Sequence, residues 1–242
     1  MTKCLIAVLL SGSVVFAHAE VRLVAGEVPP FVYRDNGVEK GVAYDLFKEM
    51  AKRVGHSGKI EMVPFVRAIE MGKTEPNMLL IPIGRNEARE KSYGWVTGLV
   101  EEEFLLFAAS NSKVDISSFE AAKDLRIGVM RASVGERIAK EKGLAKIEDV
   151  TQEDVNAKKL AGGRIDAWIG ARNSVMQGQK VAGLDRKLLR SGAVGSRINI
   201  FLASSLNFDA AEAAKWKGAL EAIKKDGTYA RILKNYEYDL PD

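Results

Sequence analysis

Cysteine and histidine are almost absent from this chain of 242 residues. The one cysteine is Cys4, and the two histidines are His18 and His56. If the first 19 residues are removed, one histidine and no cysteine remain. Disulfide bonds and thiol catalysis are then excluded. A zinc site built from cysteine and histidine is excluded too, and we expect neither a metal nor a cofactor.

Long apolar runs are also absent, apart from one short run at the start of the chain. Lys3 is followed by an apolar stretch over residues 4–16 and by a small-x-small sequence at 17–19. This order is typical of a secretory signal peptide. A membrane anchor would need about 20 apolar residues, and small residues interrupt this shorter run. We therefore expect cleavage after Ala19 and a periplasmic location.

The chain has little excess charge of either sign. Its 36 lysines and arginines against 32 acidic residues give a net charge of +4. A mildly basic surface is compatible with a small anionic ligand and equally with a nucleic acid. Export from the cytoplasm argues against a nucleic acid. We expect a small-molecule ligand and no nucleic-acid partner.

Strand-like and helix-like patterns alternate along the chain in two series. In the first series, strands are predicted over 21–26, 59–63, 77–83 and 104–110, with helices over 42–55 and 66–71. In the second, helices are predicted over 117–125, 133–143 and 150–163, with strands over 126–130 and 164–170. A strand over 198–205 and helices over 209–225 and 228–236 complete the chain. This alternation predicts an α/β fold with largely parallel sheets in two lobes.

One buried strand ends in a way that suggests an anion. The apolar run at 78–83 leads into a polar turn in which Asn86 is a good helix N-cap. Arg89 then lies in the first helical turn, where a cation opposes the helix dipole. An anion bound between the guanidinium and free backbone N–H groups would explain this placement. An ion pair from Arg89 to Glu87 or Glu101 is the alternative.

Two other strand ends carry residues that a ligand could contact. Glu27 and Tyr33 belong to a loop after the first strand, and prolines stiffen that loop. Phe65 and Arg67 follow the strand over 59–63. Taken by itself, Phe65 is more typical of a core residue than of a pocket wall. The proline loop can equally be a rigid connector.

A further strand end carries a helix-capping sequence. Ser133 and Glu136 have the S-x-x-E spacing of a capping box, just after the strand over 126–130. In open parallel sheets, ligands lie beyond the carboxyl ends of strands, near helix N-termini. The turn is therefore a candidate binding element as well as a simple cap.

These motifs, taken in order, resemble one family. They read GVAYDLFKEMAKRVG, VPFVRAIEMG, NEAR, KDLRIGVMRAS and AGGRIDAWI, and they extend over nearly the whole exported chain. Together they are similar to the bacterial extracellular solute-binding proteins of family 3, the polar amino-acid-binding receptors of ABC importers.

The resemblance implies the type II fold of periplasmic binding proteins, in which two α/β lobes joined by two hinge strands close on a ligand in the cleft. Lobe 1 would comprise 20–109 and 197–242, and lobe 2 would comprise 110–196. The implied function is to bind a small carboxylate-bearing solute and deliver it, as a non-enzymatic monomer, to a membrane permease. Two alternatives stay open: a cyclohexadienyl dehydratase-like enzyme, or the ligand-sensing input of a membrane sensor.

The resemblance also implies a carboxylate site. In relatives, the arginine of an x-E-x-R motif holds the ligand carboxylate, and here that arginine is Arg89. Backbone and hydroxyl groups of a following turn assist it, matched here by Ala132, Ser133 and Val134.

Other positions complete the implied site or depart from it. Tyr33 and Phe65 are the candidates for residues that sandwich the ligand body. Gly84 lies where relatives often carry serine or threonine. Arg67 and Arg131 could add positive charge.

The main departure concerns the ligand ammonium. Relatives hold it with an aspartate shortly after the GRIDA strand, and that position falls on Ala171. A buried ammonium without a carboxylate would be costly. Either Glu27 replaces the aspartate from the opposite lobe, or the ligand is not an ordinary α-amino acid.

Overall fold

Eight strands join in one mixed sheet with the order β4-β1-β5-β10-β6-β9-β7-β8. The computed structural model describes residues 20–238 and 240–241, so the predicted leader over 1–19 lies outside the described residues. The strands of the sheet are β1 (Arg22–Glu27), β4 (Ile60–Pro64), β5 (Met78–Gly84), β6 (Gly94–Ala109), β7 (Arg126–Met130), β8 (Lys146–Val150), β9 (Ala167–Ala171) and β10 (Leu189–Ser204). A separate hairpin pairs β2 (Tyr33–Asp35) with β3 (Val38–Lys40).

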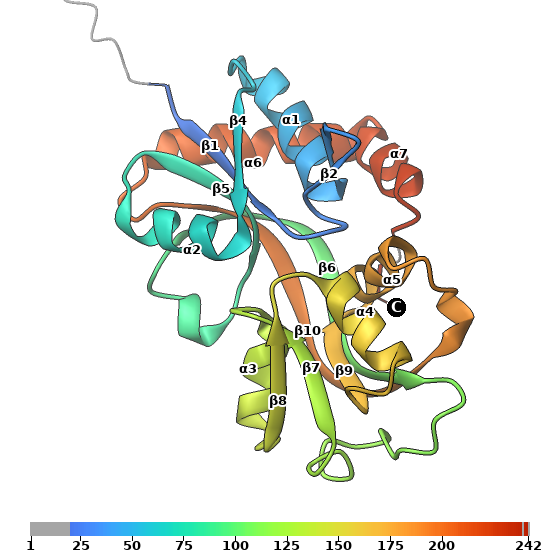
Figure 1. The fold of residues 1–242 in the computed structure, drawn as a ribbon. Coiled ribbons are helices and arrows are strands. Elements are labelled where there is room, and N and C mark those ends of the chain that lie inside the picture. Colours follow the sequence, from blue (N-terminus) through green and yellow to red (C-terminus); the bar gives the residue numbers. More distant parts are fainter. Residues whose placement is uncertain (1–19, 239, 242) are drawn as a thin grey trace, which may run out of the picture.

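Two long strands connect the halves of this sheet. β6 and β10 run antiparallel to each other from Gly94 paired with Ser204 to Ala109 paired with Leu189. β10 also pairs with β5 at one end, and β6 pairs with β9 at the other. Figure 1 shows the two strands passing side by side through the middle of the molecule. We call the half built on β1, β4 and β5 lobe 1, and the half built on β7, β8 and β9 lobe 2.

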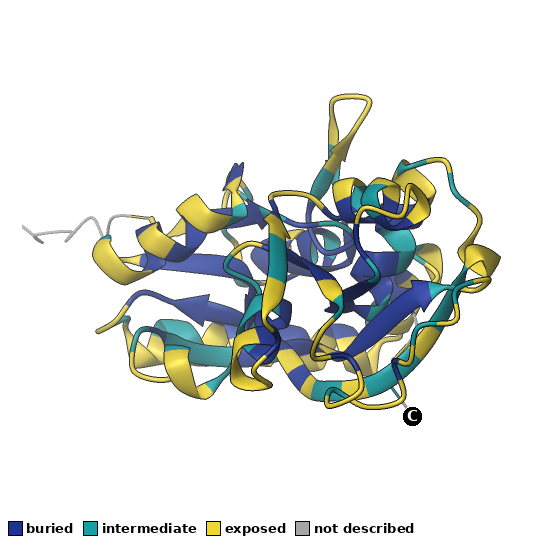
Figure 2. Ribbon diagram, turned by 60° about the horizontal axis from the view of Figure 1, so that its bottom comes forward, coloured by how far each residue is buried: buried dark blue, intermediate teal, exposed yellow. Residues whose placement is uncertain are grey.

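Helices cover the sheet in each lobe. Lobe 1 carries α1 (Val42–Val54), α2 (Phe65–Thr74), α6 (Ala210–Lys225) and α7 (Thr228–Asn235), and lobe 2 carries α3 (Val134–Glu141), α4 (Glu153–Ala161) and α5 (Arg172–Val181). The described residues also contain two short 3-10 helices, η1 (Glu87–Arg89) and η2 (Arg186–Leu188). Figure 2 shows buried strands between helices whose outer faces are exposed. Across the described residues, we find no helix with the length and apolar character needed to span a bilayer.

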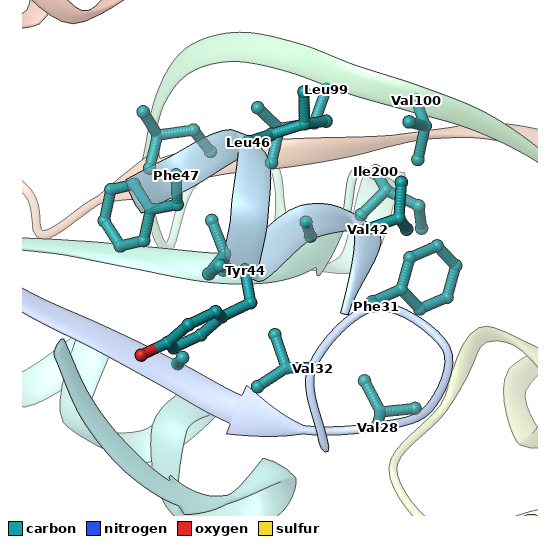
Figure 3. Packing of buried hydrophobic residues seen from close by; sticks show 14 of the residues in the cluster. Val28, Phe31, Val32, Val42, Tyr44, Leu46, Phe47, Leu99, Val100 and Ile200 are labelled. Carbon is teal, nitrogen blue, oxygen red and sulfur yellow. The ribbon is translucent and has the colours of Figure 1, made fainter. Parts of the chain in front are cut away.

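Helix α1 packs against α6 in the core of lobe 1. Its apolar stripe is buried, and its Phe47 ring lies 5.4 Å from the Trp216 ring of α6, measured between centroids. Burial of each such large apolar side chain contributes about 1.5–3 kcal/mol to the free energy of folding. Figure 3 shows Phe31, from the loop after β1, packed near Val42 and Ile200. The loop that follows β1 is therefore anchored to α1 and β10.

The parallel pairing of β1 with β4 and β5, and of β7 with β8 and β9, agrees with the predicted α/β class. The predicted helix over 117–125 is wrong, because this segment forms consecutive turns and no regular helix, and the Ser118 hydroxyl accepts a hydrogen bond in one of the turns. The predicted strand over 104–110 is only the end of β6, and β8 was not predicted. The predicted lobe boundary after 196 falls inside β10, so the assignment of residues to lobes stays a prediction.

Candidate functional site

The end of β5 positions Arg89. All residues of β5 are buried up to Gly84, and the chain then turns into η1. The Asn86 side chain accepts a hydrogen bond from the Arg89 backbone N–H at 3.1 Å, which confirms the predicted N-cap. This cap fixes the backbone of Arg89 at the edge of lobe 1, and the side chain extends from there.

The Arg89 guanidinium reaches across to lobe 2. It donates to the Gly84 carbonyl oxygen at 3.2 Å and to the Ala132 carbonyl oxygen at 2.6 Å. Burial lowers the pKa of the guanidinium. Within the described part of the chain, no carboxylate pairs with Arg89, so the alternative ion pair with Glu87 or Glu101 is not formed there.

The turn after β7 forms the opposite wall. Ala132 has a φ of 58°, and the Ser133 hydroxyl accepts from the Glu136 N–H at 3.2 Å. The Glu136 carboxylate in turn accepts from the Ala132 N–H at 2.5 Å. The predicted cap on α3 is confirmed, with the return bond made to Ala132. The result is a rigid turn whose carbonyl group faces Arg89.

Between these two elements lies a small apolar cavity of about 40 Å³. Its lining comes from both lobes and from both hinge strands. The lining residues are Val28, Phe31, Phe65, Pro82, Gly84, Arg89, Phe104, Met130, Ser133, Val134, Glu153, Ala171, Ser174, Ile198 and Ile200. We call this space the inner cavity.

A larger groove of about 560 Å³ adjoins the inner cavity. Val28, Phe65, Met130 and Glu153 line both spaces. Polar residues are more frequent here, and the remaining lining comprises Glu27, Pro29, Tyr33, Arg34, Pro64, Thr151, Gln152, Asp154, Gly178 and Val181. We call this space the outer groove.

Glu153 is the buried acidic group where the two spaces meet. It is the first residue of α4 and is only 6% exposed. Its Oε2 accepts hydrogen bonds from Trp168 Nε1 at 3.0 Å and from Asn156 Nδ2 at 3.1 Å. Burial raises the pKa of Glu153 to about 7. Near pH 7, the site therefore holds a carboxyl group that is partly protonated and partly ionised.

The structure gathers most of the predicted site residues around these two spaces. Phe65, Gly84, Arg89, Ser133 and Val134 line the inner cavity. Glu27 and Tyr33 line the outer groove, and Ala132 borders a hollow that Arg89 and Ser133 share.

Two predicted arginines lie elsewhere. Arg67 and Arg131 are exposed, neither is among the residues that line the two spaces, and Arg131 pairs with Asp149. Glu27, in the outer groove, forms an ion pair with Arg34.

Sequence reasoning missed Glu153 as a site residue. An acidic residue in a first helical turn is common because it suits the helix dipole, so nothing in the local pattern marks Glu153. Phe104, Met130, Ser174, Ile198 and Ile200 were also missed. In the described chain, no three histidine, cysteine or acidic side chains come together as a metal-binding group.

Comparison with known protein families identifies the family of this chain. The sequence profile of the bacterial extracellular solute-binding proteins, family 3, matches residues 22–238. The chain belongs to this family. Its fold is therefore the type II fold of periplasmic binding proteins, with β6 and β10 as the connecting strands.

Individual relatives are distant in sequence. The probable amino-acid-binding protein YxeM of Bacillus subtilis is 22% identical over 221 residues, which is 87% of this chain and 81% of YxeM. A histidine kinase sensor domain similar to periplasmic binding proteins superposes with a TM-score of 0.79 at 19% identity, over 89% of this chain and 95% of that one. An ancestral arginine-binding protein bound to arginine gives 0.76 at 23% identity, over 90% and 98%. The two structural likenesses support the fold.

Proposed function

We propose that this protein binds a small carboxylate-bearing solute, an amino acid or a related organic acid, in the inner cavity and outer groove. The observation that carries the proposal is Arg89. Its guanidinium donates hydrogen bonds to two carbonyl oxygens and, among the described residues, has no carboxylate partner. A guanidinium has further N–H donors in its planar fork and matches a carboxylate well.

The relatives support the same class of solute. YxeM is named as a probable amino-acid-binding protein, and the ancestral protein was solved with arginine bound. By analogy, we infer that this chain works in the periplasm as a monomer and passes its solute to the permease of an ABC importer.

Lobe closure would couple binding to delivery. Arg89 belongs to lobe 1, and the Ser133 turn belongs to lobe 2. A solute held by both elements stabilises the closed arrangement, because it makes contacts there that an open arrangement lacks. The permease would then recognise the closed protein.

A thermal-shift screen of amino acids and organic acids, followed by calorimetry, tests the proposal. A solute at about 100 times its dissociation constant should stabilise the protein by about 2.7 kcal/mol. Arg89→Ala should weaken binding by about 2–5 kcal/mol, since a desolvated carboxylate loses its partner. Arg164→Ala is the matched control, because Arg164 is exposed and is not among the residues that line the two spaces. Equal affinity in the Arg89 and Arg164 variants would remove Arg89 from the site.

The same preparation separates binding from catalysis. A carboxylic acid with a pKa of about 7, such as Glu153, could also act as a general acid. We expect no turnover when the protein is incubated with prephenate or arogenate. Formation of an aromatic product would contradict a purely binding role and favour the dehydratase-like alternative.

A further inference from the structure

Glu153 is a buried carboxyl group that pairs with no cation among the residues that the structure describes. The other acidic residues of the outer groove are neutralised by ion pairs: Glu27 contacts Arg34, and Asp154 contacts Lys158 at 2.7 Å. In the described chain, Glu153 accepts hydrogen bonds only from the neutral groups of Trp168 and Asn156. A buried charge is costly unless it is paired. Glu153 is therefore the acidic residue of the cleft that still lacks its counter-charge.

Arg89 presents the complementary situation in the same cavity. It is a cation that, within the described residues, has no carboxylate partner, and it lines the inner cavity together with Glu153. The protein thus places one cation and one latent anion around one small apolar space. A ligand that carries both charges would satisfy both groups at once.

We propose that Glu153 binds a nitrogen cation of the ligand, so that the solute is a zwitterion held between Arg89 and Glu153. This inference rests on the proposed function, since Arg89 takes the ligand carboxylate in both. It narrows the solute from any small acid to one that also carries an ammonium or guanidinium group.

Position favours Glu153 over the other groups near the cleft. Its Oε1 lies 3.5 Å from where a Cβ atom on Gly170 would stand, so the carboxyl group lies beside the end of β9. The next residue, Ala171, lines the inner cavity but carries no charge. Glu27 is partly exposed and already bound to Arg34. Glu153 alone combines burial, access to both spaces and a missing counter-charge among the described residues that line them.

The cation could belong to the α-amino group or to the ligand side chain, because Glu153 lines both the inner cavity and the outer groove. Four probes of one chain length distinguish these sources. Pentanoate has no cation, norvaline has only the α-ammonium, 5-guanidinopentanoate has only the guanidinium, and arginine has both. Calorimetry with each probe on wild type and on Glu153→Gln gives the comparison.

We expect Glu153→Gln to weaken the probes whose cation contacts Glu153 by at least about 30-fold, the lower range for removing one partner of a buried charge pair. Pentanoate should bind the variant and the wild type alike. Loss with norvaline assigns the α-ammonium, and loss with 5-guanidinopentanoate assigns the side-chain cation. Glutamine keeps an acceptor for Trp168 and Asn156, and circular dichroism checks that the variant is folded.

Other outcomes overturn the inference. An equal loss for all probes, pentanoate included, would show that Glu153 only supports lobe 2. Wild type binding pentanoate as tightly as the nitrogen-bearing probes would show that no cation is recognised. In both cases, weaker pentanoate binding by Arg89→Ala would leave the proposed function standing. Wild type binding no carboxylate at all, in this series or in the wider screen, would overturn both proposals.

Discussion

The two ionisable side chains that line the inner cavity, Arg89 and Glu153, respond differently to burial. Arg89 keeps its charge and satisfies part of its hydrogen-bonding capacity with carbonyl oxygens. Glu153 instead has a pKa raised to about 7 by burial, so a large fraction of it is neutral near pH 7 without ligand. The groups around it are Asn156 and Asp154 on its own helix, Trp168 on β9, Glu27 and Arg34 across the outer groove, and Arg89 across the inner cavity.

This difference predicts that binding of a cationic probe depends on pH. A ligand cation prefers the ionised carboxylate, so a proton must leave Glu153 before or during binding. Lowering the pH from about 8 to about 6 should weaken the cation-bearing probe by roughly tenfold, following the protonated fraction of a group with a pKa of about 7. Calorimetry at several pH values checks this. Pentanoate and the Glu153→Gln variant are the controls, and a pH-independent affinity for the cationic probe in wild type would contradict the prediction.

At the same scale, the sequence marks some site residues and hides others. Arg89 and Ser133 were predicted because each follows an apolar strand at a helix start, and such local patterns are visible in sequence. Glu153 has the same local pattern as an ordinary exposed first-turn residue. Its burial is decided by α5 and β9, which bring Gly178 and Gly170 against it. That contact between distant segments is not encoded in any short stretch.

At the scale of elements, the placement of α3 on β9 controls one wall of the cleft. Gly135 lies in the first turn of α3, and a Cβ atom there would stand 2.8 Å from the Ile169 carbonyl oxygen of β9. Gly135→Ala should push the helix from the strand and displace Ser133. We expect a loss of stability of about 1–3 kcal/mol, measured by urea unfolding, together with weaker binding of the screened solute.

Gly218 is the matched control for this substitution. It is exposed in α6, and a Cβ atom there meets nothing within 4 Å. Gly218→Ala should therefore stabilise the protein by about 0.5–1 kcal/mol, because alanine is the better helix residue. If both variants changed stability in the same direction, the close approach of α3 to β9 would not be the cause.

The elements themselves were predictable in proportion to their regularity. The continuous apolar run of β5 and the amphipathic stripe of α1, closed by Gly55 with a φ of 75°, were predicted nearly to the residue. β8 was missed because it is an edge strand with mostly polar, partly exposed residues, paired only with β7. The first part of β6 was missed because a strand that crosses between lobes changes its buried face along its length.

At the scale of the whole molecule, two buried carboxyl groups shape the pH dependence of stability. Glu102, on the connecting strand β6, is fully buried and accepts hydrogen bonds from Asn173 of lobe 2 and from Tyr238 after α7. Burial raises the pKa of Glu102 to about 7, as it does for Glu153. Their unfolded pKa is near 4.5, so the folded protein binds more protons than the unfolded chain between those values.

The free energy of unfolding without ligand should therefore fall as the pH rises from about 4.5 to about 7, and should then level off. Neutral glutamine at both positions removes the titrating groups, so Glu102→Gln combined with Glu153→Gln should flatten this decline. Urea unfolding at a series of pH values measures it. A wild-type stability that rises across this window would show that other groups dominate the titration.

The small size of the inner cavity implies that the lobes must separate to admit a solute. A space of about 40 Å³ holds only a few water-sized groups, and the bond from Arg89 to the Ala132 carbonyl oxygen spans the two lobes. Rotation about the strands β6 and β10 is the motion that the topology allows without breaking either lobe. We therefore expect the protein without ligand to adopt an open arrangement in solution, and the bound state should be more compact than that open arrangement.

Arg89→Ala removes the contact between the lobes as well as the carboxylate partner. In small-angle scattering without ligand, this variant should have a radius of gyration equal to or larger than that of wild type. A saturating solute from the screen should compact the wild type and Arg164→Ala, but not Arg89→Ala at the same concentration. If saturating solute leaves the wild-type curve unchanged while calorimetry reports binding, the solute does not act by closing the lobes, and the proposed delivery to a permease would have to depend on another feature of the bound protein.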